Sequence, residues 1–192
     1  MTLWEIDLHP AAGEPDLLAR TILSEAADLG LGQFEARGAR GFLVQGDVSQ
    51  PQVERIAREL IADLVVEVPL VGKPGEMLGN TPLADSQVIH VLPKPGVTDP
   101  VAASTLAAIE DFGIAADAVV TLRKYWISGL NDAQLHTLAT KLLANDSIEQ
   151  VVFGPLKIQQ IHLGSPYRFE AVTLSIRSLD DDALLALSKQ RT

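Results

Sequence analysis

The sequence predicts an α+β protein in which one structural unit occurs twice. The first observation is a repeat: residues 7–16 (DLHPAAGEPD) recur at 90–99 (HVLPKPGVTD), with a proline, a glycine and an aspartate in the same places. The second is the length of the repeat. Matching residues are 83 positions apart as far as the pair Gly46 and Gly129, and 82 positions apart after it. The third is that each copy alternates strand-like and helix-like segments.

The second copy shows these elements most clearly. Two prolines and a glycine at 93–96 end the first strand, and Asp99-Pro100 supplies an N-cap acceptor and a first-turn proline for the helix that follows. Gly113 is a natural stop for that helix, and Asn131 caps a second one. The expected elements are a strand at 88–92, a helix from Asp99 to Gly113, a hairpin of 119–122 and 125–127 around Arg123-Lys124, a helix from Asn131 to Leu142, and a strand at 148–153.

The first copy repeats this order. We expect a strand at 3–8, a helix at 16–29, a hairpin of 33–37 and 41–44 around Gly38-Ala39-Arg40, a helix at 50–62 and a strand at 64–68. We expect the inner face of its first helix to be formed by Ala19, Leu23, Ala26 and Leu29. The order β-α-β-β-α-β is that of a ferredoxin-like unit, in which helices cover one face of an antiparallel sheet.

The other face of each sheet needs a second cover. A half-exposed strand alternates apolar and polar residues, but 42–44 and 125–127 are apolar on both sides. We therefore expect the two units to pack sheet against sheet as a pseudo-dimer, with Leu43 and Trp126 at the interface.

This arrangement implies four regions of the chain. They are a first unit at 1–69, a Gly/Pro-rich linker at 70–86, a second unit at 87–153 and a C-terminal extension at 154–192. In the extension we expect strands at 158–163 and 169–176 and a helix entry at 178–182. Its end at Thr192 suggests a segment that continues into a further domain.

Charge and composition exclude several classes of function. The net charge is −10, and residues 1–69 alone carry 12 acidic against 5 basic residues, which disfavours binding to nucleic acid. No apolar run is long enough to span a bilayer and no secretion signal is recognised, so we expect a cytoplasmic protein with no membrane partner. Without cysteine, the chain has no disulfide, no thiolate ligand and no cysteine nucleophile.

The motifs of nucleotide loops and serine hydrolases are missing, and the four histidines lack ligand spacing. We therefore expect no catalytic, cofactor or metal residues. The Asp180–Asp182 run fits a helix N-terminus better than a metal site. The Pro-x-x-Gly-x-x-Asp loops are interpreted as rigid strand exits with helix caps. The compact positive positions of the chain are Arg37, Arg40, Arg123 and Lys124. They are candidate contacts for an anion or for a partner's carboxylate, and the alternative is that they lie in solvated turns.

The second unit resembles the small, PurS-type subunit of phosphoribosylformylglycinamidine synthase. The matching features are the Pro/Gly loop, the Asp99-Pro100 helix start, Leu106 to Phe112-Gly113, the Lys124-Tyr125 step and the Ile-Glu-Gln-Val at 148–151. The first unit resembles a more divergent copy, with Gly41 where Lys124 stands in the second. The segment at 179–191 resembles the lead into the synthetase domain of the single-chain synthase.

The resemblance implies a non-catalytic role in de novo purine biosynthesis. Such units assemble the synthetase and glutaminase parts of an ATP- and glutamine-dependent ligase, support ammonia passage between them, and associate with copies of themselves. The alternatives are a regulatory pair of ferredoxin-like units that binds a small ligand, as amino-acid-sensing domains do, and an independent enzyme.

Overall fold

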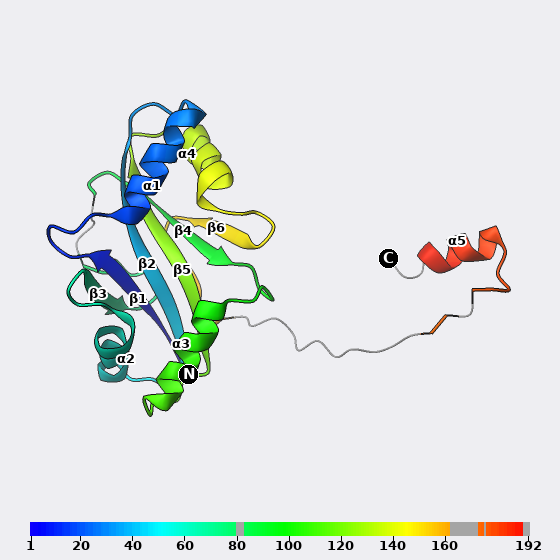
Figure 1. Ribbon diagram of the computed structural model, residues 1–192, viewed down its shortest axis with the longest axis horizontal. Coiled ribbons are helices and arrows are strands. Elements are labelled where there is room, and N and C mark those ends of the chain that lie inside the picture. Colours follow the sequence, from blue (N-terminus) through cyan, green and yellow to red (C-terminus); the bar gives the residue numbers. More distant parts are fainter. Residues whose placement is uncertain (80–82, 162–172, 175, 190–192) are drawn as a thin grey trace.

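The computed structural model describes residues 1–79, 83–161, 173–174 and 176–189. The fold is α+β, and its elements follow one another along the chain as Figure 1 labels them. They are β1 (Thr2–Pro10), α1 (Leu17–Ala26), η1 (Ala27–Leu29), β2 (Glu35–Gly46), α2 (Gln50–Ile56), η2 (Ala57–Ile61), β3 (Glu67–Gly72), β4 (Gln87–Pro93), α3 (Pro100–Asp111), β5 (Ala118–Ser128), α4 (Asp132–Leu138), η3 (Ala139–Leu143), β6 (Glu149–Phe153) and α5 (Asp181–Lys189).

All six strands form one antiparallel sheet in the order β3-β1-β2-β5-β4-β6. The expected packing of sheet against sheet is therefore wrong: the two halves of the chain join edge to edge through β2 and β5. In this central pair Arg40 lies opposite Arg123, two residues that the offset of 83 relates to each other. Leu8 of β1 lies opposite Arg40 of β2, and the residues 83 positions later, Val91 of β4 and Arg123 of β5, also lie opposite each other.

The two expected hairpins are also wrong, because β2 and β5 each run straight through the expected turn. The glycines of the first copy suggest a turn, but in the structure they leave room for leucine side chains that lie close to the strand. A Cβ at Gly38 would lie 2.5 Å from Cβ of Leu18, and one at Gly41 would lie 2.7 Å from Cγ of Leu122. A strand can hold glycine where another chain segment approaches this closely.

The helices that pack on the sheet are exchanged between the two halves. Ala19 and Ile22 of α1 lie in one apolar core with Val91 of β4 and Ile127 of β5, which belong to the other half. Figure 1 shows α1 beside α4 at one end of the molecule and α3 near α2 at the other. Leu23 of α1, which we expected on the inner face, is 38 % exposed.

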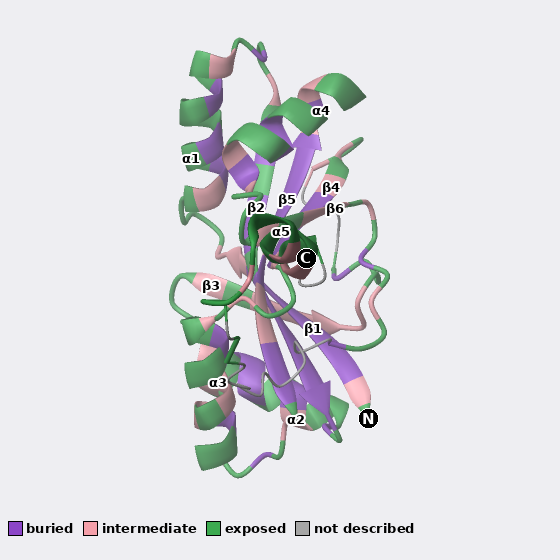
Figure 2. Cartoon of the chain, turned by 90° about the vertical axis from the view of Figure 1, so that its right-hand side faces the viewer, coloured by how far each residue is buried: buried purple, intermediate pink, exposed green. Residues whose placement is uncertain are grey.

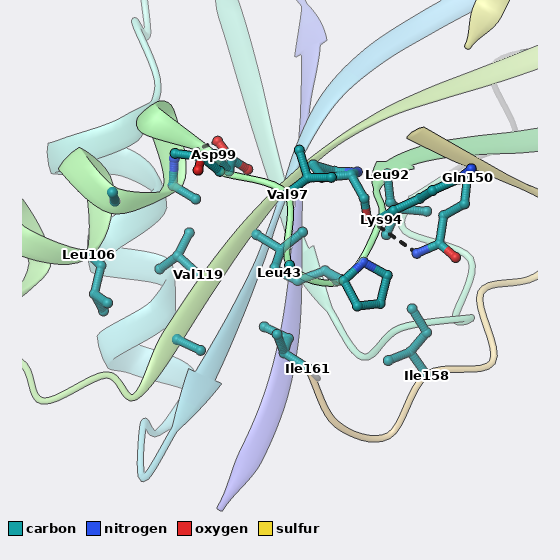
Figure 3. A pocket seen from close by; sticks show the side chains of 18 of the residues that line it. Leu43, Leu92, Lys94, Val97, Asp99, Leu106, Val119, Gln150, Ile158 and Ile161 are labelled. Carbon is teal, nitrogen blue, oxygen red and sulfur yellow. Dashed lines mark hydrogen bonds between the residues drawn. The ribbon is translucent and has the colours of Figure 1, made fainter. Parts of the chain in front are cut away.

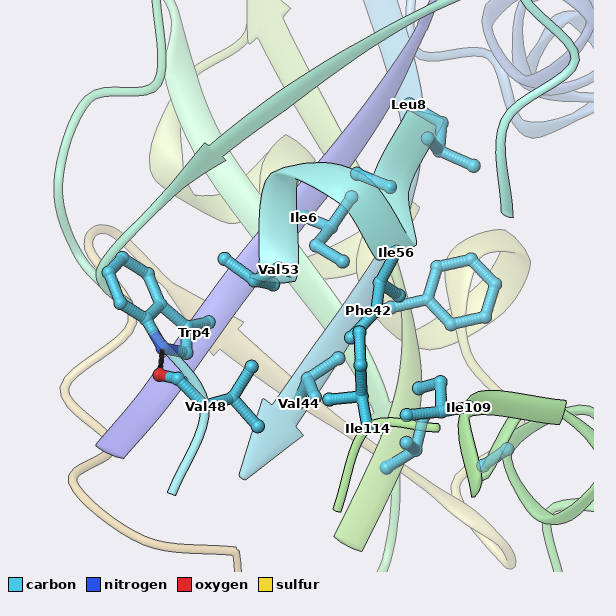
Figure 4. Packing of buried hydrophobic residues seen from close by; sticks show 13 residues of the cluster. Trp4, Ile6, Leu8, Phe42, Val44, Val48, Val53, Ile56, Ile109 and Ile114 are labelled. Carbon is cyan, nitrogen blue, oxygen red and sulfur yellow. Dashed lines mark hydrogen bonds between the residues drawn. The ribbon is translucent and has the colours of Figure 1, made fainter. Parts of the chain in front are cut away.

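The second core is the counterpart of the first. Ile109 of α3 packs with Ile56 of α2 over Ile6 of β1 and Val44 of β2 (Figure 4). Each core is thus built from both halves of the sequence. Figure 2 shows the consequence: the strands are largely buried, and the helices are buried only along the sides that face them. Neither half can keep its core if the other is removed.

The segments outside the two halves cover the helix-free face. In the linker, 70–72 belong to β3, and Leu78 is buried against the sheet rather than part of an extended connection. In the extension, 158–161 form no strand, while 162–163 and most of 169–176 lie outside the described residues. The helix entry at 178–182 is confirmed, because Asp180 Oδ1 accepts a hydrogen bond from Ala183 N at the start of α5.

Candidate functional site

The helix-free face of the sheet carries a buried group of ionisable side chains. Glu5 and Asp7 come from β1, Lys124 from β5 and His90 from β4, and all four are buried. Charged side chains are rarely this well buried unless they are paired. We call these four residues the ionic cluster.

Lys124 holds the ionic cluster together. Its Nζ donates to Glu5 Oε1 at 2.8 Å and to Asp7 Oδ2 at 2.7 Å. Strand β2 lies between β5 and β1, so the lysine side chain must pass over it. It can do so because Ala39 stands opposite Lys124 and Gly41 stands opposite Asp7, and neither residue carries a side chain large enough to block the path.

The charges in the ionic cluster do not balance by themselves. Burial raises the pKa of Glu5 and Asp7 above their ordinary values, and the charge of Asp7 raises that of Glu5 further, against the opposing effect of Lys124. For Lys124, burial lowers the pKa, but the two carboxylates outweigh this and raise it overall. Two carboxylates thus share one ammonium group, and burial favours uptake of a proton by the carboxyl pair.

Some buried polar atoms of the ionic cluster make no hydrogen bond among the described residues. They are Glu5 Oε2, Asp7 Oδ1 and His90 Nδ1, with His9 Nε2 beside them. Burial, and next the charge of Lys124, lower the pKa of His90 to about 4 and also lower that of His9. Both imidazoles are therefore neutral at pH 7 and add no positive charge to the site.

Two chain segments form a roof over this face. Leu78 from the linker and Leu156 and Ile161 from the extension are buried on it. Under the roof Leu43 is 1 % exposed and Trp126 is 8 % exposed. The expectation that both are buried is confirmed, but the roof covers them and not a second sheet. A cavity of about 230 Å³ remains between the roof, Trp126 and the ionic cluster.

A larger cavity of about 570 Å³ opens beside the loop at 93–99 (Figure 3). Its wall is mostly apolar, with Leu43, Leu92, Leu106 and Ile161 among the lining residues. Polar groups at its edge include Gln150, which donates a hydrogen bond to Pro93 O. Cavities of this size and character are typical of small-molecule sites.

The aspartates of the two Pro-x-x-Gly-x-x-Asp loops have equivalent structural roles. Asp16 accepts hydrogen bonds from Ala19 N in α1 and from Gly38 N in β2. Asp99 accepts them from Ala102 N in α3 and from the backbone N and Oγ1 of Thr121 in β5. Each aspartate thus caps a helix and ties it to a strand, which confirms the structural interpretation of these loops.

Burial opposes the ionised form of Asp99, yet its pKa is lowered. Desolvation alone would raise the pKa, but the hydrogen bonds from Ala102 and Thr121 outweigh it. The carboxylate, which lies at the edge of the neighbouring cavity, therefore stays ionised and is held in place by donors of the fold.

The four cations expected to bind anions are spread over both faces of the sheet. Arg40 pairs with Glu67 at 2.6 Å and Arg123 with Glu149 at 2.6 Å, while Lys124 is enclosed in the ionic cluster. Arg37 is exposed, and its Nη1 donates to the carbonyl of Ala36. No two of them converge on a common anion site, because Arg40 and Arg123 already hold carboxylates and Lys124 lies under the roof. The expectation that they occupy turns is wrong.

Sequence reasoning missed Glu5, Asp7 and His90. Glu5 and Asp7 alternate with apolar residues in β1, a pattern that ordinarily indicates a solvated face. The apolar strands at 42–44 and 125–127 indicate that this face is covered, but they do not show that Glu5 and Asp7 meet Lys124 two strands away. Among the described residues, no group of three or more histidine or acidic side chains is placed to hold a metal ion.

Comparisons with known proteins do not identify a family for this chain. No protein-family model matches the chain, and no curated protein matches it. In the part of the chain that the structure describes, no helix is both long and apolar enough to cross a membrane.

Proposed function

We propose that this chain is a non-catalytic assembly module of phosphoribosylformylglycinamidine synthase, made of two PurS-like units fused in one chain. In this role it binds the synthetase and glutaminase parts in the cytoplasm and supports ammonia passage between them. The proposal rests on the resemblance of the second unit and on the architecture of the sheet.

One observation carries the proposal. The two halves meet through β2 and β5, with offset-related residues Arg40 and Arg123 opposite each other, and they exchange helices α1 and α3. This is the geometry expected when two copies of a small subunit pair about a two-fold axis. It supports the interpretation that a self-associating subunit was duplicated and joined.

The C-terminal helix supplies a surface for the synthetase part. α5 has no buried residue, and its Leu184 and Leu185 are exposed. An amphipathic helix with leucines open to solvent is suited to packing against another protein surface.

Affinity co-purification tests the proposal. The tagged chain is expected to retain the synthetase and glutaminase parts from a mixture that contains ATP and glutamine. The double variant Leu184→Asp/Leu185→Asp should weaken retention of the synthetase, whereas Leu17→Asp, which changes an exposed leucine on α1, should not. No retention of either part by the unaltered chain would refute the proposal.

A second candidate function is favoured by the cavity beside the loop at 93–99. Its volume of about 570 Å³ and apolar wall suit a small ligand, as a regulatory domain would require. Thermal-shift measurements with amino acids and nucleotides separate the two functions. A specific ligand that raises the melting temperature, together with no co-purification, would favour the regulatory role.

A further inference from the structure

We infer that β6 is a docking edge at which a second copy of this chain adds its own β6, antiparallel, about a two-fold axis at Val151. This inference goes beyond the proposed function and does not depend on it. It rests on the backbone groups of the two outer strands, β3 and β6.

The direction of the backbone groups in β6 follows from its pairing with β4. Lys94 N donates to Ile148 O and Gly154 N donates to Val88 O. In an antiparallel ladder, residues alternate between bonding the neighbour and pointing away from it. The groups of Ile148, Gln150 and Val152 therefore face β4, and those of Glu149, Val151 and Phe153 face outward.

The opposite edge of the sheet has the same pattern with one difference. Ala11 N donates to Val66 O, so the outward residues of β3 are Glu67, Pro69 and Val71. Pro69 has no N–H to offer, and proline on an edge strand blocks the addition of another strand. The offset of 82 relates Pro69 to Val151, so one edge is closed at the position where the other is open.

The outward row of β6 is complementary to itself. Among the described backbone groups, Glu149 N is already bonded to Asn145 O, and no partner is found for those of Val151 and Phe153. With a two-fold axis at Val151, each Val151 exchanges two hydrogen bonds with its copy. Each Phe153 N then donates to Glu149 O of the second copy. Every free donor in the row finds an acceptor.

Side chains and charge favour a second copy as the occupant. Ile148 is 47 % exposed and Phe153 is 37 % exposed, so apolar surface flanks the open edge. Residues 87–153 carry 7 acidic against 4 basic residues, whereas 1–69 carry 12 against 5. Contact at β6 thus brings the less acidic halves together. Because only one of the two outer strands in the described sheet, β6, is open, association closes at two chains instead of continuing as a fibre.

Sedimentation velocity on the full 192-residue chain, from about 1 to about 200 µM, tests this inference. The expected result is a concentration-dependent dimer of about 41 kDa, twice the chain mass of 20.6 kDa. Val151→Pro removes an outward N–H that makes no bond within the sheet, and Pro69 shows that the fold accepts proline at the related position. We expect this variant to fold and its dimer to be at least about tenfold weaker.

Two further variants keep the test decisive. Phe153→Asp leaves the backbone unchanged, places a carboxylate opposite Glu149 of the second copy, and should also yield monomers. Pro69→Val opens the second edge and should produce species larger than the dimer. A chain that stays monomeric at every concentration overturns the inference. A dimer that Val151→Pro and Phe153→Asp both leave intact overturns it equally.

Discussion

Replacing Lys124 with methionine tests the ionic cluster directly. The substitution keeps most of the unbranched apolar stem of the side chain and removes the charged ammonium group. Glu5 and Asp7, both fully buried, then share their enclosure with no cation and lose hydrogen bonds of 2.8 and 2.7 Å. Removing one partner of a buried ion pair costs about 3–5 kcal/mol. That is a large part of the roughly 5–15 kcal/mol that stabilises a domain.

The pH dependence of this loss identifies its cause. Without Lys124, the pKa of each carboxyl in the folded state lies above its unfolded value, because burial is no longer opposed. The folded state then binds protons more readily than the unfolded state, so the variant regains stability as pH falls through the folded pKa towards the unfolded one. We expect the deficit to be largest at pH 7 and smaller near pH 4.5.

Urea unfolding followed by far-UV circular dichroism measures these free energies. Lys94→Met serves as the matched control, because Lys94 is exposed and should lose under about 1 kcal/mol. Adding Glu5→Gln and Asp7→Asn to the Lys124→Met variant should restore most of the stability. A loss below about 1 kcal/mol for Lys124→Met, or the same loss at both pH values, would show that Lys124 does not stabilise the buried carboxylates.

Four further changes probe other parts of the fold. His90 has a pKa of about 4 in the folded state against 6.5 ordinarily, so the free energy of unfolding falls by about 3 kcal/mol as pH falls from 6.5 towards 4. His90→Gln should remove this pH dependence, measured by urea unfolding at several pH values, and an unchanged pH dependence would contradict the assignment to His90. Gly41→Ala places a Cβ 2.7 Å from Leu122 and should cost about 1–3 kcal/mol by the same measurement. Asp99→Ala removes a cap and should lower the free energy of unfolding by about 1–2 kcal/mol, with Asp99→Asn milder. Arg40→Ala breaks an ion pair whose arginine is 52 % exposed and should change calorimetric stability by under about 1 kcal/mol; a larger loss would show that the pair is better shielded than its exposure indicates.

The sequence predicted the local elements better than their assembly. Capping signals placed the helices correctly, because Asp99 and Asn131 accept hydrogen bonds from residues only three positions ahead. The hairpin expected in the first copy is wrong because Gly38 and Gly41 make room for Leu18 and Leu122, which are distant in the sequence. Local patterns carry no information about such long-range contacts.

The candidate site was the least predictable part. Lys124 could be singled out as a positive position in an acidic chain, but its partners could not. The pairing of Lys124 with Glu5 depends on β2 standing between β5 and β1 and on a small residue at position 41. Burial of Leu43 and Trp126 followed from their apolar strands, whereas the roof that buries them comes from a Gly/Pro-rich segment and from the extension.

Sedimentation velocity of a mixture is the sharpest test of the proposal that this chain is a binding module for the parts of a synthase. The full chain is combined with the synthetase and glutaminase parts in the presence of ATP and glutamine. We expect a faster boundary that contains all three components, and we expect the Leu184→Asp/Leu185→Asp variant to diminish it. Boundaries identical to those of the separate components would contradict it.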